Sequence, residues 1–150
     1  MEYQRTIQNE VSLEGIGLHT GNKVRVRFKP AMGNSGVNFI RVDMPDKPVI
    51  KAHIGNVIDL ATRPRRTSVG KQDIEVQTIE HVMASLVCLG IDNITIEIDS
   101  NEFPGLDGSA SPFLEVLRKA GIREIEEPKK YFRIREALWA EEDDASIVIL

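Results

Sequence analysis

A glutamate and a histidine stand side by side at Glu80 and His81, near the start of a segment with helical periodicity. A neutral imidazole is a good zinc ligand, and an adjacent carboxylate can serve as general base for water at the metal. Neighbouring residues of a helix point about 100° apart, so both side chains reach one pocket only if the helix begins at its rim. The alternative is a solvated glutamate beside a partly buried histidine.

A glycine-rich segment, GIGLHTG at residues 15–21, contains His19. Three glycines in seven residues are compatible with a loop that binds phosphate through its backbone amides. Neither the G-x-G-x-x-G nor the G-x-x-x-x-G-K-S/T pattern is present, however. The competing interpretation is a tight turn between two strands, with His19 as a hydrogen-bonded turn residue.

Two other loops carry charged side chains. A basic loop contains Arg63, Arg65 and Arg66. Their guanidinium groups suit a diphosphate, or else they are solvated surface charge. Asp107 precedes a second helical pattern, where it either forms a turn with Gly108 or orients a catalytic group.

The residues visible in the sequence do not complete a zinc site. A catalytic zinc ordinarily has about three protein ligands and one open position. The histidines His19, His53 and His81 are scattered, with no second ligand pair at helical spacing, and we assign His53 no role. Pattern alone therefore leads only to a soluble domain.

The composition is that of a soluble globular protein. Apolar residues make up 41% and charged residues 28% of the 150 residues, and the formal net charge is −4. This charge disfavours non-specific binding to nucleic acid. No apolar run reaches the roughly 18 residues of a membrane helix, and the first residues lack the apolar core of a signal peptide. We therefore expect a cytoplasmic protein without a transmembrane segment.

The first third of the chain has the pattern of strands joined by turns. Segment 24–28 alternates apolar and basic residues, which is the period of a half-buried strand. A turn at 33–36 followed by the apolar segment 37–42 predicts a hairpin partner for it. Pro45 and Pro48 make the next stretch a loop or an edge strand.

Two helices are predicted, with an alternating strand at 94–99 between them. The first is expected to begin at an N-cap at Thr78 and to end at Gly90, and the second to run from an N-cap at Ser111 to Gly121. The apolar face of the first helix consists of Ile79, Val82, Met83, Leu86 and Val87.

This order of elements favours an α+β two-layer sandwich, in which two helices cover one face of a mixed β-sheet. Ile74 and Val76, separated by Glu75, are expected to end a short strand before the first helix. The only cysteine, Cys88, lies in an apolar stretch of that helix, which predicts a buried, unreactive thiol.

A domain boundary is expected near 124–128, a segment with three glutamates and a proline. The first domain would then comprise residues 1–127. Residues 128–150 would begin a second, similar domain, with strands at 131–140 and 146–150 around an acidic turn. The chain stops inside an apolar run, which favours a second domain that is cut off.

Four motifs occur together: GIGLHTG at 15–21, QTIEHVMASL at 77–86, LGIDN at 89–93 and LDGSASPF at 106–113. Their order and spacing resemble those of the UDP-3-O-acyl-N-acetylglucosamine deacetylase family. Each motif is modest by itself, but four in order are highly specific. The resemblance covers essentially the whole chain, up to KKYFRI at 129–134, where the family's second domain begins.

The resemblance implies the amino-terminal half of a zinc-dependent enzyme that removes the acetyl group from UDP-3-O-acyl-N-acetylglucosamine in lipid A biosynthesis. In that family two similar α+β domains enclose the metal. The resemblance implies that Glu80 is the general base and His81 a zinc ligand. It also places Asp107 and His19 at positions that support activity.

The remaining zinc ligands implied by the resemblance, a histidine and an aspartate one helical turn apart, belong to the second domain and are not found by residue 150. The partner histidine and the acyl-chain passage also belong there. We therefore expect this chain alone to bind zinc poorly and to have negligible deacetylase activity. Two alternatives stay open: a non-catalytic interaction module with the first-domain fold, and a phosphate-binding protein that uses the basic loop.

Overall fold

The computed structural model describes residues 2–59, 61–71 and 74–150. The strands are β1 (Tyr3–Ile7), β2 (Val11–Ile16), β3 (Lys23–Pro30), β4 (Val37–Arg41), β5 (Val49–Lys51), β6 (Ser68–Lys71), β7 (Ile74–Gln77), β8 (Ile94–Ile98), β9 (Ile122–Pro128), β10 (Leu138–Glu142) and β11 (Ala145–Ile149). The helices are α1 (Glu80–Leu89) and α2 (Ser111–Ala120), with a short 3-10 helix at Ile54–Asn56. Within the described residues, no helix is long and apolar enough to cross a membrane.

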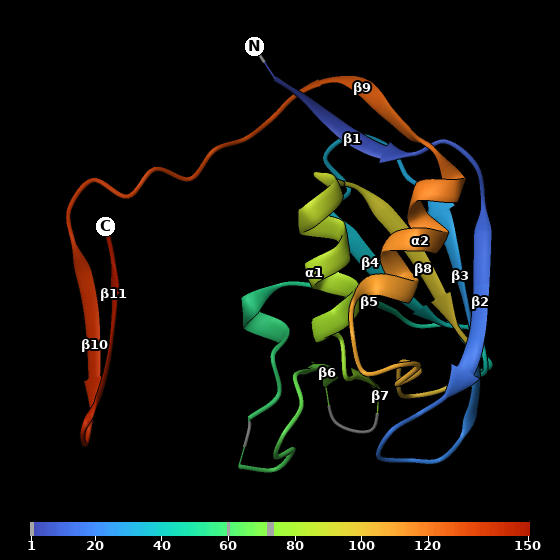
Figure 1. Ribbon diagram of the computed structural model, residues 1–150, viewed down its shortest axis with the longest axis horizontal. Coiled ribbons are helices and arrows are strands. Elements are labelled where there is room, and N and C mark those ends of the chain that lie inside the picture. Colours follow the sequence, from blue (N-terminus) through green and yellow to red (C-terminus); the bar gives the residue numbers. More distant parts are fainter. Residues whose placement is uncertain (1, 60, 72–73) are drawn as a thin grey trace.

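A five-stranded mixed sheet, in the order β2-β3-β8-β4-β5, forms the centre of the fold. The middle strand, β8, is antiparallel to β3 and parallel to β4, so that Ile96 lies opposite both Phe28 and Phe39. Figure 1 shows α1 and α2 side by side against one face of this sheet. The predicted α+β two-layer sandwich is confirmed.

The predicted hairpin between segments 24–28 and 37–42 is wrong. Both segments are strands, β3 and β4, but β8 lies between them and pairs with each. Its residues Ile94, Ile96 and Ile98 are fully buried, which suits a strand with a partner on both sides. Alternation along a strand defines its buried face, whereas the neighbouring strand is chosen by tertiary packing.

Three aromatic rings join the sheet to the helical layer. The rings of Phe39 and Phe103 meet edge to face with centroids 5.6 Å apart, and those of Phe103 and Phe113 do so at 6.1 Å. Such pairs contribute about 0.5–1.5 kcal/mol each beyond their area burial. Phe103 therefore anchors the segment between β8 and α2 in the core, and that segment also carries Asp107.

The predicted N-caps are both wrong by one residue. Ile79 is the N-cap of α1 and Ala110 that of α2, and neither makes a capping hydrogen bond through its side chain. Thr78 instead has φ 57°, and its hydroxyl donates to the carboxylate of Glu102. Ser111 is the first residue of its helix rather than the residue before it. The Thr78 hydroxyl, which the local pattern assigned to capping, thus bonds to Glu102 in a later segment instead.

The carboxyl end of α1 differs from the prediction in one respect. Gly90, with φ 63°, ends α1, and Gly121 ends α2, as predicted. Cys88, however, is exposed rather than buried. Val87 is also 77% exposed, although Val82 and Leu86 are buried. The buried face of α1 is therefore narrower at this end than the apolar pattern indicated.

The carboxy-terminal part leaves the body of the fold after β9. Segment 124–128, near which the domain boundary is expected, is part of β9, which pairs antiparallel with β1. The predicted strand 131–140 begins only at Leu138, and the turn between β10 and β11 is reduced to residues 143–144. Figure 1 shows the β10–β11 hairpin apart from the body, at the end of an extended segment.

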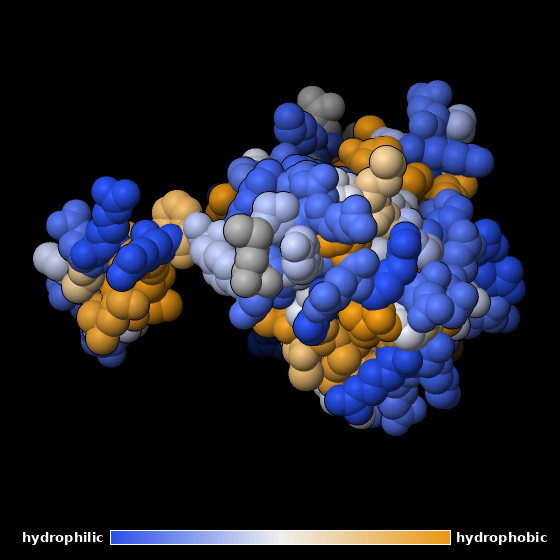
Figure 2. All heavy atoms as spheres, turned by 90° about the horizontal axis from the view of Figure 1, so that it is seen from above, coloured by the Kyte–Doolittle hydropathy of each residue, from blue (hydrophilic) through white to orange (hydrophobic). Residues whose placement is uncertain are grey.

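The hairpin exposes large apolar side chains, and Figure 2 shows it as a separate lobe with apolar surface. Trp139, the only tryptophan, is 70% exposed. We therefore expect the fluorescence of this chain in dilute solution to have the emission maximum of a solvated indole and to be quenched readily by acrylamide. A short-wavelength maximum with weak quenching would show that Trp139 is covered.

Candidate active site

The start of α1 brings Glu80 to the surface and leaves His81 half-buried. The Glu80 carboxylate accepts a short hydrogen bond from the backbone N–H of Thr67, in the segment before β6. Neither side chain is enclosed in the core. This access is what the roles of general base for Glu80 and zinc ligand for His81 require. Exposure alone agrees equally with a solvated glutamate beside a partly buried histidine. It therefore does not distinguish this interpretation from that of a general base beside a zinc ligand.

The first turn of α1 is fastened to the start of α2 by Ser85. This serine is fully buried, and its hydroxyl lies 2.8 Å from the carbonyl oxygen of His81 and 3.0 Å from that of Ala110. A hydroxyl donates one hydrogen bond at a time, so the two carbonyls share this donor. The backbone of His81 is therefore kept close to the turn that precedes α2.

Asp107 lies in that turn and close to His81. Its Oδ1 accepts hydrogen bonds from the backbone N–H of Ser109 at 2.9 Å and from the Ser109 hydroxyl at 2.8 Å. These two bonds lower the pKa of Asp107 below its ordinary value, and the charge of His81 lowers it further. Asp107 thus forms the turn, as one interpretation predicted, and lies within electrostatic range of His81.

The loop after β2 carries His19, whose side chain is exposed. Its backbone N–H donates to both oxygens of the Glu102 carboxylate, at 3.0 and 3.1 Å. The backbone N–H and the hydroxyl of Thr20 donate to Oε2 of the same carboxylate, both at 2.8 Å. The amides that a phosphate would need are therefore taken by an internal carboxylate, which favours the tight turn.

Gly17 shows why this turn needs a glycine. A Cβ atom there would lie 2.5 Å from Oε2 of Glu102 and 2.5 Å from Oγ1 of Thr20. Both distances are far below van der Waals contact. Gly17 is thus explained by the close approach of the loop to Glu102 rather than by a bound phosphate.

Glu102 is the residue of this region that the sequence analysis missed. It is fully buried and also accepts a hydrogen bond from the Thr78 hydroxyl at 3.0 Å. Burial by itself raises the pKa of Glu102, but the hydrogen bonds from His19, Thr20 and Thr78 outweigh it and hold the pKa below its ordinary 4.5. The sequence contained one signal of this burial. Glu102 stands directly before the apolar pair Phe103-Pro104 and has no oppositely charged residue at helical spacing.

We expect Glu102 to contribute stability that is lost in acid. Because its pKa in the folded chain lies below the ordinary 4.5, the unfolded chain takes up the proton first as the pH falls. The contribution is fully present above the unfolded pKa and disappears as the pH falls through the folded pKa. Urea unfolding of the chain and of Glu102→Gln, followed from about pH 6 to about pH 3, should show the difference between them shrinking. A difference that stays constant would contradict this origin.

One of the three guanidinium groups of the basic loop is engaged within the fold. The Nε of Arg63 lies 3.0 Å from Oε2 of Glu75, whose side chain is buried on β7. Arg65 is exposed and has φ 61°. Because Arg63 is occupied by this ion pair, the alternative of a diphosphate site at the loop loses one of its three cations.

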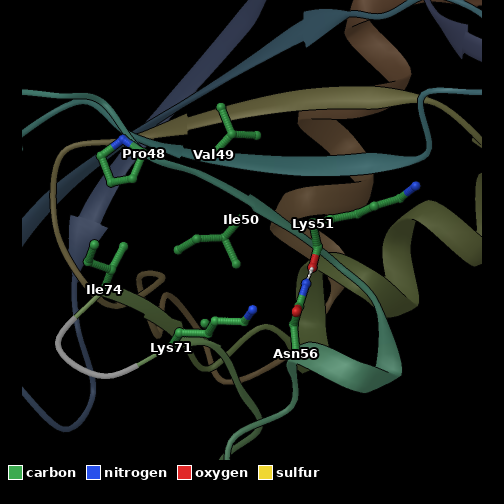
Figure 3. Close-up of a pocket in the computed structure, with 8 residues that line it drawn as sticks. Pro48, Val49, Ile50, Lys51, Asn56, Lys71 and Ile74 are labelled. Carbon is green, nitrogen blue, oxygen red and sulfur yellow. Dashed lines mark hydrogen bonds between the residues drawn. The ribbon is translucent and has the colours of Figure 1, made fainter.

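A cavity of about 400 Å³ lies between β5 and the β6–β7 ribbon (Figure 3). Its apolar lining includes Ile50 and Ile74, and the Lys71 side chain extends toward Asn56. None of the four candidate site residues is among those that line it. This cavity is therefore separate from the candidate active site at the start of α1.

The donor set of the described residues does not fit a complete zinc site. No group of three or more histidine, cysteine, aspartate or glutamate side chains in this part of the chain is arranged to hold a metal. His81 offers one imidazole, with Glu80 beside it. A zinc site with about three protein ligands would need the others from outside these residues.

Comparison with known proteins gives consistent matches. The family model described as LpxC, UDP-3-O-acyl N-acetylglycosamine deacetylase, matches residues 4–150. The chain is 47% identical over 148 residues to the bifunctional enzyme LpxC/FabZ of Chlorobaculum tepidum, covering 99% of this chain and 31% of that protein.

Two further relatives carry the name UDP-3-O-acyl-N-acetylglucosamine deacetylase. The one from Methylococcus capsulatus is 40% identical over 141 residues, which are 94% of this chain and 45% of the relative. The one from Shewanella oneidensis is 43% identical over 144 residues, which are 96% of this chain and 46% of the relative. The chain thus spans less than half the length of each of these relatives.

Proposed function

Because the chain belongs to the UDP-3-O-acyl N-acetylglycosamine deacetylase family, we propose that it supplies the amino-terminal half of a zinc-dependent deacetylase. The substrate is UDP-3-O-acyl-N-acetylglucosamine and the products are acetate and the free glucosamine amine, in lipid A biosynthesis. One observation carries this proposal: an exposed Glu80 and a half-buried His81 open α1, and Ser85 links the backbone of His81 to the turn that holds Asp107.

The residues of this chain have distinct tasks in the proposed reaction. The chemistry that a bound zinc ion would supply is polarisation of the acetyl carbonyl and a more acidic water. Glu80 accepts the proton of the attacking water, and the Thr67 N–H orients its carboxylate. His81 would contribute one ligand to the metal, and the Asp107 carboxylate, in the turn before α2, would support activity by its charge near His81. His19, exposed in the loop that Glu102 joins to Thr78, would support activity from that loop.

The other ligands come, in this proposal, from a second domain. We place the boundary between residues 127 and 128, at the end of β9, after which an extended segment leads to the β10–β11 hairpin. A single imidazole does not retain zinc at a catalytic site, so the 150-residue chain alone is inactive. The reaction is assigned to the cytoplasm, where a UDP-linked sugar substrate is available.

Acetate release tests the proposal. The comparison is between this chain alone and a joined protein, in which this chain is followed by the part of the Methylococcus capsulatus relative beyond the matched segment. We expect acetate release and about one zinc per molecule in the joined protein, and neither in the chain alone. The proposal fails if the chain alone turns over at the rate of the joined protein, or if a folded, zinc-loaded joined protein is inactive.

A further inference from the structure

We propose that Glu102 is a positioning residue, which fixes the His19 loop against the start of α1 and thereby sets the place of His19 relative to Glu80 and His81. The catalytic consequence rests on the proposed function. The coupling itself, through one buried carboxylate, is a property of this chain and is testable without activity.

The hydrogen bonds of Glu102 reach two separate elements. Oε1 accepts from the His19 N–H and from the Thr78 hydroxyl, both at 3.0 Å. Oε2 accepts from the His19 N–H at 3.1 Å and from the N–H and hydroxyl of Thr20 at 2.8 Å. A buried carboxylate is costly unless its oxygens are satisfied, and here the donors come from the loop on one side and from the residue before α1 on the other.

Backbone hydrogen bonds place the segment around Glu102 between the same two elements. The N–H of Gln77 donates to the carbonyl of Asn101 at 2.8 Å, and the N–H of Phe103 donates to the carbonyl of Gln77 at 3.1 Å. On the other side, the N–H of Gly105 donates to the carbonyl of Ile16 at 2.9 Å. These backbone hydrogen bonds hold residues 101–105 in place. Among the described residues, the hydrogen bonds that reach His19 itself come from the Glu102 carboxylate.

The conformation of Thr78 makes the start of α1 sensitive to Glu102. A φ of 57° is unfavourable for a β-branched residue and persists only where neighbouring groups compensate it. The hydrogen bond from the Thr78 hydroxyl to Glu102 is such a compensation. Because Thr78 precedes Glu80 by two residues, releasing it changes the path by which the chain enters the first helical turn.

A glutamine cannot reproduce this arrangement. The His19 N–H lies within hydrogen-bond distance of both carboxylate oxygens, so either orientation of a glutamine amide turns an NH₂ group toward that donor. An oxygen can still accept from Thr20 in one orientation. Glu102→Gln therefore weakens the contact to His19 and is nearly equal in volume, so it isolates the role of the charge.

Amide NMR spectra of this chain test the coupling. Glu102→Gln should shift the signals of His19 and Thr20 and also those of Glu80 and His81, while signals of β8 keep their positions. The matched control is Glu14→Gln, a change at an exposed glutamate that pairs with Arg25. Changes confined to residues 101–103 would overturn the proposal.

A second variant keeps the test decisive if Glu102→Gln does not fold. Thr78→Val removes one donor and leaves the carboxylate in place. It should shift the signals of His19, on the far side of Glu102, as well as those of Glu80. Thr95→Val on β8 is the matched control and should shift neither. Unchanged His19 signals in a folded Thr78→Val chain would contradict the coupling.

Kinetics of the joined protein distinguish positioning from stability alone. We expect Glu102→Gln to lower kcat about 10- to 100-fold at unchanged zinc content, with little effect on KM, because misplaced groups cost catalysis rather than binding. A purely structural role would lower the melting temperature and leave kcat per folded molecule unchanged. If the unsubstituted joined protein is inactive, the proposed function fails, and the NMR comparison still decides whether Glu102 couples the two elements.

Discussion

Replacing Glu80 by glutamine in the joined protein should lower kcat about 100- to 10,000-fold, the usual contribution of a general base. Glutamine preserves the size of the side chain and still offers an oxygen to the Thr67 N–H. It cannot take a proton from water at neutral pH. The loss therefore measures proton transfer rather than a change in the fold of the first turn of α1.

Acetate release under saturating substrate, with zinc content determined on the same sample, provides the measurement. Glu115→Gln is the matched control, because Glu115 is an exposed glutamate on α2 and is expected to leave kcat unchanged. If the Glu80 variant kept the kcat of the unsubstituted protein at full zinc loading, another residue would have to be the base.

Replacing His81 by alanine should remove zinc from the joined protein and with it the activity. Residues that merely orient a zinc ligand typically contribute 10- to 100-fold to metal affinity, so we expect the loss of a ligand itself to exceed about 100-fold. His81 is half-buried on α1, whose first turn is fastened by Ser85 to the carbonyl of Ala110. The fold of the helix is therefore expected to survive the substitution.

Metal competition with a chelator, followed by mass spectrometry of the bound zinc, measures this affinity. The control is His53→Ala, since His53 is an exposed histidine whose Nδ1 accepts a hydrogen bond from the N–H of Gly55 at 3.1 Å. Its loss affects the short 3-10 helix and leaves zinc affinity unchanged. Equal zinc retention by the two variants would remove His81 from the ligand set.

Much of the fold follows from local patterns in the sequence. The alternation in segment 24–28 predicted β3, and the glycines at positions 90 and 121 predicted where the helices end, because these signals depend on the chain's own periodicity and backbone freedom. The partner of β4 could not be found this way. Pairing with β8 joins segments far apart in sequence, and the apolar pattern of both strands allows several neighbours.

The candidate site was predictable only in part, and for a related reason. Glu80, His81, Asp107 and His19 were proposed through the resemblance of the motifs. The structure places Glu80 and His81 at the start of α1, and Ser85 links His81 to the turn that holds Asp107. Glu102 was missed because a charged residue in a turn-rich segment normally indicates surface. Its burial depends on donors from two distant segments, and no local pattern records them.

The most direct test is the zinc K-edge X-ray absorption spectrum of the joined protein. We expect nitrogen and oxygen ligands, with a multiple-scattering contribution from imidazole that decreases by one ring in His81→Ala reconstituted with excess zinc. An imidazole count that is the same with and without His81 would mean that α1 does not bind the metal, and the assignment of this helix to the active site would be wrong.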